Sequence, residues 1–438
     1  MPILLKEYQQ RRQDLINHME PNSIAILASA NPLLRNGDSE YRFRQSSDLH
    51  YLTGFDEAHA VLVLIPGREK GECLLFCQEK DPLKELWNGR LLGPDAAILQ
   101  LGVDDAFPIT DIDDILPGLI EGCERVYYAM GKDEQFDHRV MEWVKVVRLK
   151  VRSGVHSPGE FMVLDHLLHE MRLIKSKAEL DIMRESGQIA VRAHKRAMQV
   201  SKPGLFEYQV EAEFMHEFFR SGCRAPAYTS IVAGGANACI LHYNENNMVL
   251  NNGDLLLIDA GCEYEYYASD ITRTFPVNGR FSPEQKAIYE LVLKAQLAAI
   301  EQVKPGNHWN DPHDTTVKVL TAGLVELGLL QGEVDKLIES GAYRDFYMHR
   351  AGHWLGMDVH DCGNYKIDGK WRQLEPGMVL TVEPGLYVAV NNEKVEPRWR
   401  GIGVRIEDDV AVTRSGYEVL TSGLPKTVAE IETFMAAR

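Results

Sequence analysis

The first third of the chain alternates short apolar runs with polar stretches of helical periodicity. The apolar runs occupy residues 23–28, 59–65, 73–77 and 125–130. Runs of this length, separated by polar and periodic segments, are typical of buried strands with helices between them. The pattern therefore predicts an α/β domain over residues 1–173.

The pattern changes near residue 171, where a helical stretch from Ala178 to Val200 follows without an intervening strand. We place a second domain over residues 174–438. Within it, residues 200–204 and 303–306 share a Lys-Pro-Gly sequence, and each precedes a helical pattern. A duplicated αβ unit with two pseudo-symmetric halves accounts for this repeat. The segment Ser282-Pro283-Glu284-Gln285 predicts a capped helix start.

Length, charge and cysteine usage narrow the possible functions. A chain of 438 residues suits two domains better than one core. The formal net charge of −17, without a block of Lys or Arg, argues against nucleic acid and anionic membranes as partners. The N-terminus lacks an apolar signal-like core, and no stretch reaches the ~20 apolar residues of a membrane span. With seven scattered cysteines, expected to be reduced and buried, these features predict a cytoplasmic protein.

Two aspartates stand in apolar surroundings in the second domain. Asp259 closes the run Leu255–Ile258, and Asp270 lies eleven residues later in a run of strand formers. Burying an ionised carboxylate costs several kcal/mol, roughly, unless a cation or a partner compensates it. We expect the two residues on neighbouring strands of a hairpin, facing each other. The alternative is a turn at Asp259 and an ion pair of Asp270 with Arg273.

Three histidines, His349, His353 and His360, fall within residues 349–361. The first two are four residues apart, but Gly352 lies between them and the glutamate of a helical H-E-x-x-H motif is missing, which argues against that zinc site. Histidine is a common nitrogen ligand and the usual proton carrier near neutral pH. A structural hydrogen bond remains the alternative for each of the three.

Two glutamates follow. Glu383 stands directly before a Pro-Gly turn, and the proline favours an extended conformation at Glu383. Period-2 alternation in residues 401–409 places Arg405 and Glu407 on one face of a strand. They either form a cross-strand salt bridge, or Glu407 is a bridging metal ligand that Arg405 supports.

Asp259, Asp270, His353, Glu383 and Glu407 form a donor set dominated by carboxylate oxygens. Such a set suits Mn²⁺, Co²⁺, Fe²⁺ or Zn²⁺, and its negative charge exceeds what one divalent ion needs. Two ions together can activate a water molecule and polarise a carbonyl, so the set predicts a two-metal hydrolase. His242, His349 and His360 then remain as candidate proton carriers.

This ordered set resembles the metallopeptidases of the pita-bread fold. The segments HWLGMDVHD (353–361), TVEPGLY (381–387), GVRIEDD (403–409) and ILHYNEN (240–246) resemble bacterial Xaa-Pro aminopeptidases, also called aminopeptidase P. Residues 38–48 and 51–55 resemble the amino-terminal domain of that family, so the likeness covers nearly the whole chain. It implies an N-terminal α/β domain followed by a pita-bread α+β domain with an internal pseudo-two-fold repeat.

The resemblance also implies roles for individual residues. Asp259, Asp270 and Glu407 serve one metal ion, Asp270, His353, Glu383 and Glu407 serve the other, and Mn²⁺ is the usual ion. Glu383 is the base that deprotonates the attacking water, and His242 and His360 orient or stabilise the scissile carbonyl. The substrate is a peptide with proline in second position. The residues expected at the substrate are His349, Arg405, Tyr387, Trp87 and Asp38.

Other functions remain open from the sequence. An Xaa-Pro dipeptidase shares the metal set but requires the free carboxylate of a dipeptide. A methionine aminopeptidase would lack the long first domain, and a creatinase-like hydrolase would lack the full ligand set. A catalytically inactive pita-bread domain that binds proteins would have lost ligands, whereas all five are present.

Two further expectations concern exposed positions. We expect a homo-oligomer, a dimer or tetramer, in which the first domain carries the contacts and residues 85–90 take part, although Trp87 is alternatively a core residue. Arg350 stands where relatives have a small residue, directly after His349. It is either at the mouth of the cleft, where it favours acidic or carboxylate-bearing substrates, or an ordinary surface residue.

Overall fold

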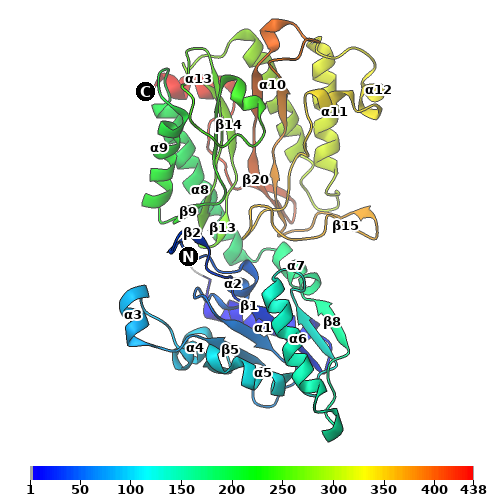
Figure 1. Cartoon of the computed structure of the whole chain (residues 1–438). Coiled ribbons are helices and arrows are strands. Elements are labelled where there is room, and N and C mark those ends of the chain that lie inside the picture. The colour runs from blue at the N-terminus through cyan, green and yellow to red at the C-terminus, as the bar shows by residue number, and fades with distance from the viewer. Residues whose placement is uncertain (1–2, 438) are drawn as a thin grey trace. The chain divides into compact units, whose positions relative to one another are not determined.

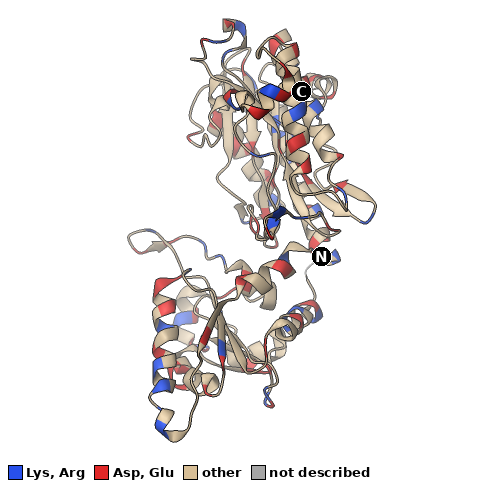
Figure 2. Cartoon of the chain, turned by 90° about the vertical axis from the view of Figure 1, so that its right-hand side faces the viewer, with Lys and Arg blue, Asp and Glu red and all other residues tan. Residues whose placement is uncertain are grey.

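The structure is a computed structural model that describes residues 3–437. It contains two compact units, residues 3–171 and residues 172–437, which we call the N-terminal and the C-terminal unit (Figure 1). Of the helices in this described part, none combines the length and the apolar character that a bilayer crossing requires. Acidic and basic residues are interspersed over the helices of both units (Figure 2).

The N-terminal unit is built on a mixed six-stranded sheet in the order β6-β5-β4-β1-β7-β8. The strands of this sheet are β1 (Ser23–Ala28), β4 (Val61–Leu64), β5 (Cys73–Cys77), β6 (Asp105–Pro108), β7 (Arg125–Tyr128) and β8 (Glu160–Val163). Two further short strands of the unit, β2 (Leu34–Asn36) and β3 (Ser39–Glu40), pair with each other. Its α-helices are α1 (Leu5–His18), α2 (Ser47–Thr53), α3 (Pro82–Asn88), α4 (Pro94–Leu101), α5 (Ile112–Ile120), α6 (Glu134–Arg148) and α7 (Asp165–Leu173). The four apolar runs of the sequence lie in β1, β4, β5 and β7, which confirms the α/β character of this part.

The C-terminal unit combines long helices with short antiparallel sheets. Its helices are α8 (Lys177–Val200), α9 (Glu207–Arg220), α10 (Pro283–Ile300), α11 (Asp311–Glu326), α12 (Val334–Glu339) and α13 (Val428–Ala436). The strands that position the site are β10 (Ile231–Gly234), β11 (Leu255–Asp259), β14 (Thr272–Pro276), β17 (Val379–Val382), β18 (Gly385–Val388), β19 (Ile402–Arg405), β20 (Asp408–Thr413) and β21 (Gly416–Val419). The remaining strands are β9 (Ala225–Pro226), β12 (Cys262–Tyr264), β13 (Tyr267–Ala268), β15 (Lys366–Ile367) and β16 (Lys370–Trp371).

The long helices begin where the sequence places polar caps. The Ser176 side chain accepts the N–H of Glu179 at the start of α8, and Ser282 does the same for Gln285 at the start of α10. Each cap satisfies backbone donors that the first helical turn leaves free. The apolar faces of α8 and α10 then pack into one large core with the strands beneath them.

The C-terminal unit repeats one arrangement twice. Helices α8 and α9 pack as a pair, as do α10 and α11, and each pair is joined by a segment that contains Lys-Pro-Gly. Helix α9 of the first pair contacts β10 in the antiparallel sheet β10-β11-β14, and α10 of the second pair contacts β17 in the sheet β17-β20-β21. This duplication agrees with the internal repeat that the sequence predicts.

Candidate functional site

The four acidic residues of the predicted site come from equivalent places in the two halves. Asp259 ends β11 and Asp270 lies just before β14, the strand that pairs with β11. Glu383 follows β17 and Glu407 precedes β20, which pairs with β17. Each half therefore contributes two carboxylates from the ends of two paired strands. The hairpin β12–β13 is inserted between Asp259 and Asp270, so the two do not belong to one simple hairpin.

The five predicted ligands lie together. His353 Nε2 is 3.4 Å from Asp270 Oδ2 and 3.7 Å from Glu383 Oε1. Donor atoms of Asp270, His353 and Glu407 all lie within 4.8 Å of one another. The Tyr228 hydroxyl lies 2.6 Å from Asp259 Oδ1 and 2.5 Å from Asp270 Oδ1, which joins Asp259 to the group.

Crowding of carboxylates in a buried place shifts their protonation. Burial and the neighbouring acids raise the pKa of Glu383 to about 7, and they raise the pKa values of Asp270 and Glu407 as well. Burial opposes the charge on His353, but its hydrogen bond to Asp270 and the nearby Glu383 raise its pKa to about 9. The site thus concentrates negative charge in a medium of low polarity, where it is costly without cations.

A layer of polar side chains holds the carboxylates in place. Arg405 donates from Nη2 to Asp259 Oδ2 at 2.6 Å and from Nη1 to the Tyr387 hydroxyl at 3.0 Å. The Thr272 hydroxyl donates to Glu407 Oε2 at 2.7 Å. The salt bridge of Arg405 is therefore made with Asp259, while Glu407 takes its hydrogen bond from Thr272.

Gly352 brings His353 close to Glu383. Residues 351–353 run beside β17, because the N–H of Thr381 donates to the His353 carbonyl and the N–H of Glu383 donates to the Ala351 carbonyl. A Cβ atom on Gly352 would lie 2.0 Å from the Thr381 carbonyl oxygen, which is far inside van der Waals contact. A glycine is therefore required for this backbone contact, and through it for the position of His353.

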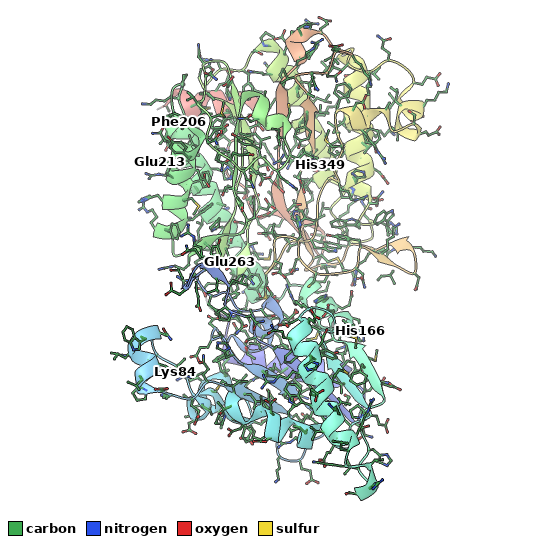
Figure 3. All side chains as sticks on the ribbon, in the orientation of Figure 1. Lys84, His166, Phe206, Glu213, Glu263 and His349 are labelled. Carbon is green, nitrogen blue, oxygen red and sulfur yellow. The ribbon has the colours of Figure 1, made fainter. Side chains whose placement is uncertain are left out.

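The three remaining histidines of the prediction surround the carboxylates. His349, which Figure 3 labels within the C-terminal unit, has Nε2 at 2.9 Å from the Tyr387 hydroxyl and Nδ1 at 3.9 Å from Glu383 Oε2. The ring of His360 lies 4.3 Å from the ring of His353, centre to centre. The pKa of His360 is lowered first by burial, then by His353 and more weakly by His242. This effect indicates that His242, which is exposed, lies near His360.

Comparison with known proteins agrees with this geometry. The profile described as Metallopeptidase family M24 matches residues 181–414, more than half of the chain, and the profile described as Aminopeptidase P, N-terminal domain, matches residues 8–127. The chain belongs to metallopeptidase family M24.

Relatives of this M24 chain resemble it over its whole length. The Xaa-Pro aminopeptidase of Haemophilus influenzae is 47% identical, over 98% of this chain and 97% of that protein. The structure of Pseudomonas aeruginosa aminopeptidase PepP has a TM-score of 0.99 and 62% identity, covering 100% of this chain and 99% of that one. A Zn-substituted Escherichia coli aminopeptidase P in complex with product has a TM-score of 0.97 and 46% identity, and the match covers 100% of this chain and 99% of that one.

The residues of this M24 chain fit the metal that its family implies. Four carboxylates and one imidazole converge, and within residues 3–437 Arg405 is the only arginine or lysine that forms an ion pair with a carboxylate of the set, through Asp259. Burial, together with the neighbouring acids, raises the pKa values of Asp270, Glu383 and Glu407, so their ionised forms need more positive charge than Arg405 and His353 supply. Oxygen-rich donor sets of this kind suit divalent ions.

Sequence reasoning missed several residues that support the metal site. Tyr228, Thr272 and Thr381 contact the carboxylates through hydroxyl groups, and no local pattern marks them as functional. Asp361, next to His360, is buried and accepts from Arg172 Nη2 at 2.7 Å and from Lys175 Nζ at 2.8 Å. These buried ion pairs of Asp361 anchor the loop that carries His360. The position of Asp361 directly after His360 is the signal in the sequence that could have identified it.

Two predicted substrate residues lie in the N-terminal unit. Trp87 is on α3 and is 83% exposed, so it is not a core residue. Asp38 is exposed in the turn between β2 and β3. A role of either side chain at the substrate stays a prediction.

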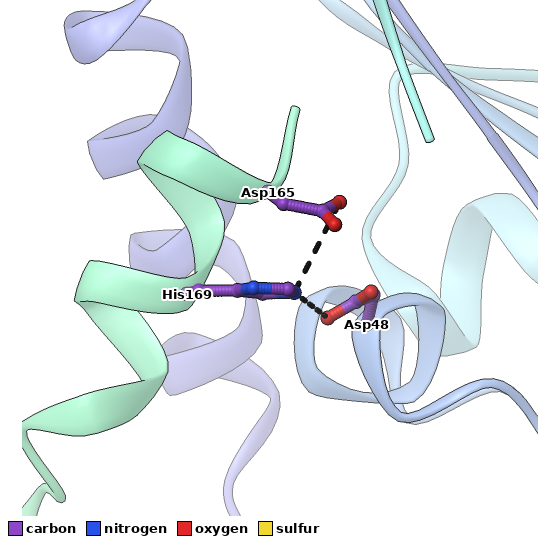
Figure 4. A group of neighbouring side chains, drawn as sticks. All are labelled: Asp48, Asp165 and His169. Carbon is purple, nitrogen blue, oxygen red and sulfur yellow. Dashed lines mark ion pairs between the residues drawn. The ribbon is translucent and has the colours of Figure 1, made fainter. Parts of the chain in front are cut away.

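The N-terminal unit contains a second group of possible ligands, Asp48, Asp165 and His169 (Figure 4). His169 Nε2 lies 3.8 Å from Asp48 Oδ1 and 3.9 Å from Asp165 Oδ1. Lys132 Nζ lies 3.4 Å from Asp48 Oδ2, so a fixed cation already faces this group. We interpret it as an ion-pair network that joins α2 to α7.

The stability of the metal-free protein is expected to fall as the pH rises from 6.5 to 9. Because the pKa values of Glu383 and His353 are raised to about 7 and about 9, the folded state holds protons that the unfolded state releases in this range. Histidines with lowered pKa values, such as His349 at about 4, change the pH dependence of stability only below pH 6.5, the ordinary pKa of histidine. After chelation, the melting temperature should drop by about 2 °C or more across this window.

The control is a Glu407→Gln variant, in which the drop should be smaller because one carboxylate is gone. Saturating divalent metal should also flatten the dependence, because bound cations favour the charged carboxylates. A melting temperature that rises with pH in chelated wild-type protein contradicts the raised pKa values.

Proposed function

We propose that this metallopeptidase releases the N-terminal residue from peptides that have proline in second position, using two divalent metal ions, and that these ions are Mn²⁺. One combined observation carries the proposal. The complete donor set converges in a chain that is 46–47% identical, over nearly its whole length, to two Xaa-Pro aminopeptidases.

We assign the ligands from the grouping of donor atoms and from the family likeness. Asp259, Asp270 and Glu407 would hold one ion, and Asp270, His353, Glu383 and Glu407 the other. Burial and neighbouring acids raise the pKa values of Asp270 and Glu407, the two carboxylates shared by both positions. When bound, such ions activate water and polarise a carbonyl group.

The protein side chains then handle protons and orientation. Glu383 accepts a proton from the attacking water at a carboxylate oxygen and returns it to the leaving nitrogen of proline. His360 and His242 face the developing charge on the scissile carbonyl oxygen. Arg405 fixes Tyr387, and the Tyr387 hydroxyl fixes the His349 ring that lines the substrate site.

The substrate test compares second residues. Xaa-Pro-Yaa peptides are expected to lose their first residue, whereas otherwise identical peptides with alanine in second place react at least about tenfold more slowly, because only proline presents a tertiary amide with a fixed φ angle. Release of the free first amino acid, measured by mass spectrometry, gives both rates. Equal rates would exclude proline specificity.

The same assay separates the neighbouring alternatives. A dipeptidase cleaves Xaa-Pro and leaves Xaa-Pro-Yaa intact, whereas the proposed aminopeptidase cleaves the tripeptide. An inactive binding module cleaves neither peptide. The five-member donor set favours an active enzyme, because each ligand position is occupied by a donor residue.

We also propose that the chain forms a homo-oligomer through the N-terminal unit. Helix α3, where Figure 3 labels Lys84, has no buried residue and projects from its unit in Figure 1. Leu83, Leu86 and Trp87 on this helix are 72%, 76% and 83% exposed, which is unusual for three large apolar side chains on two helical turns.

Light scattering should give a dimer or tetramer, and Leu86→Glu should shift the mass toward the monomer. Leu99→Glu, at another exposed leucine of the N-terminal unit, is the control. A monomeric wild-type chain ends this proposal. The location in the cytoplasm stays a prediction.

A further inference from the structure

The guanidinium of Arg350 is held by uncharged partners. Its Nη2 donates to the side-chain oxygen of Asn310, and its Cζ lies 4.8 Å from the centre of the Trp371 ring. Lys366, the cross-strand partner of Trp371, places Nζ 4.2 Å from the same ring. Two cations thus gather on one aromatic side chain, which attracts them but does not neutralise them.

The charge of Arg350 has no carboxylate partner. Within residues 3–437, neither Arg350 nor Lys366 forms an ion pair, although the chain has a net charge of −17. Arg398 shows the contrasting case, because it also lies over a tryptophan ring, Trp399 at 5.3 Å, but is paired with Glu396 at 3.0 Å. A guanidinium has five donors, of which Asn310 takes one, and its planar fork matches a carboxylate.

The position of Arg350 connects it to the catalytic groups. It follows His349, whose ring lies 3.9 Å from Glu383. One small cavity is lined both by Arg350 and by Thr381, and the Thr381 hydroxyl lies 3.3 Å from Glu383. Arg350 is exposed, whereas Thr381 is buried, so this cavity has Arg350 on its solvent side and Thr381 on its inner side.

We propose that Arg350 determines substrate preference by binding a carboxylate on the part of the peptide that follows the scissile bond. This inference rests on the proposed function, since an aminopeptidase encloses the N-terminal residue and lets the rest of the peptide extend toward solvent. The carboxylate is either the C-terminus of a tripeptide or an acidic side chain in third place. Both present the same two oxygens to the guanidinium fork.

Two peptide pairs test the proposal and separate the two sources. The first pair is Ala-Pro-Ala and its C-terminal amide, and the second is Ala-Pro-Glu-amide and Ala-Pro-Gln-amide. The wild-type enzyme is expected to favour the charged member of at least one pair by about tenfold in kcat/KM, mainly through KM, because an exposed ion pair strengthens binding rather than the chemical step. The pair that shows the preference identifies the carboxylate.

The variants then assign the preference to Arg350. Arg350→Gln should reduce the ratio between charged and neutral peptides to about one, and Arg350→Lys should restore part of it, since a lysine keeps the charge but loses the fork. Added salt should weaken the wild-type preference and leave the ratio of Arg350→Gln unchanged. Arg398→Gln, which removes another tryptophan-stacked arginine, should keep the wild-type ratio.

The outcomes distinguish this inference from the proposed function. If the wild-type enzyme cleaves no Ala-Pro peptide, the proposed function is wrong and the inference falls with it. If it cleaves charged and neutral members equally, or if Arg350→Gln keeps the wild-type ratio, Arg350 is an ordinary surface residue and the function stands. A loss of the ratio in Arg398→Gln as well would also overturn the role of Arg350, because the effect would then be one of overall charge.

Discussion

Replacing Glu407 by glutamine is expected to remove bound metal and to lower kcat/KM by about 10³-fold or more. Glu407 is 2% exposed, and its carboxylate shares a group of donor atoms with Asp270 and His353. A glutamine keeps the size of the side chain and can still contact Thr272, but it removes the negative charge and one of the two oxygen donors. Both metal positions that we assign to Glu407 are weakened at once.

Two measurements check this result. Metal content by mass spectrometry should fall in Glu407→Gln, together with the rate on an Xaa-Pro-Yaa peptide, and circular dichroism should still report a folded chain. Chelated wild-type protein should lose activity and regain it with Mn²⁺. Glu393→Gln, at an exposed glutamate, is the matched control and should keep both metal and rate. Normal metal content and rate in Glu407→Gln would falsify the ligand assignment.

The second large effect is expected for His360→Ala, which should lower kcat by about 10²-fold while metal content stays near that of the wild type. His360 lies outside the compact donor group of Asp270, His353 and Glu407, although its ring lies only 4.3 Å from that of His353. It is exposed, whereas the buried pairing of Asp361 with Lys175 and Arg172 holds its loop. Truncating the ring therefore removes a group that faces the substrate and leaves the loop anchored.

His242→Ala should behave in the same way, because His242 is near enough to His360 to help lower the pKa of His360. His216→Ala, at an exposed histidine on α9, is the control and should keep the wild-type kcat. The decisive comparison is kcat against bound metal in each variant. Loss of metal in His360→Ala would make His360 a ligand or a structural residue instead of a catalytic one.

Local chemistry made much of the fold predictable. The capped starts of α8 and α10 follow from Ser176 and Ser282, because a cap depends only on residues within one helical turn. Four of the six strands of the N-terminal sheet, β1, β4, β5 and β7, coincide with the predicted apolar runs, since each run is long enough to form one buried strand. The five donor residues were visible for a similar reason, as charged or titratable groups that interrupt apolar segments.

The sequence by itself determined which side chains carry the charge of this site, while the tertiary structure decided how they are held. Arg405 pairs with Asp259, 146 residues away, instead of with Glu407, which lies beyond the end of β19 and not on the same strand as the sequence pattern predicts. Tyr228 joins Asp259 to Asp270, and Gly352 is required by the Thr381 carbonyl. Each of these contacts depends on which strands become neighbours, and that choice is made by the burial of apolar surface over the whole unit, which no local pattern encodes.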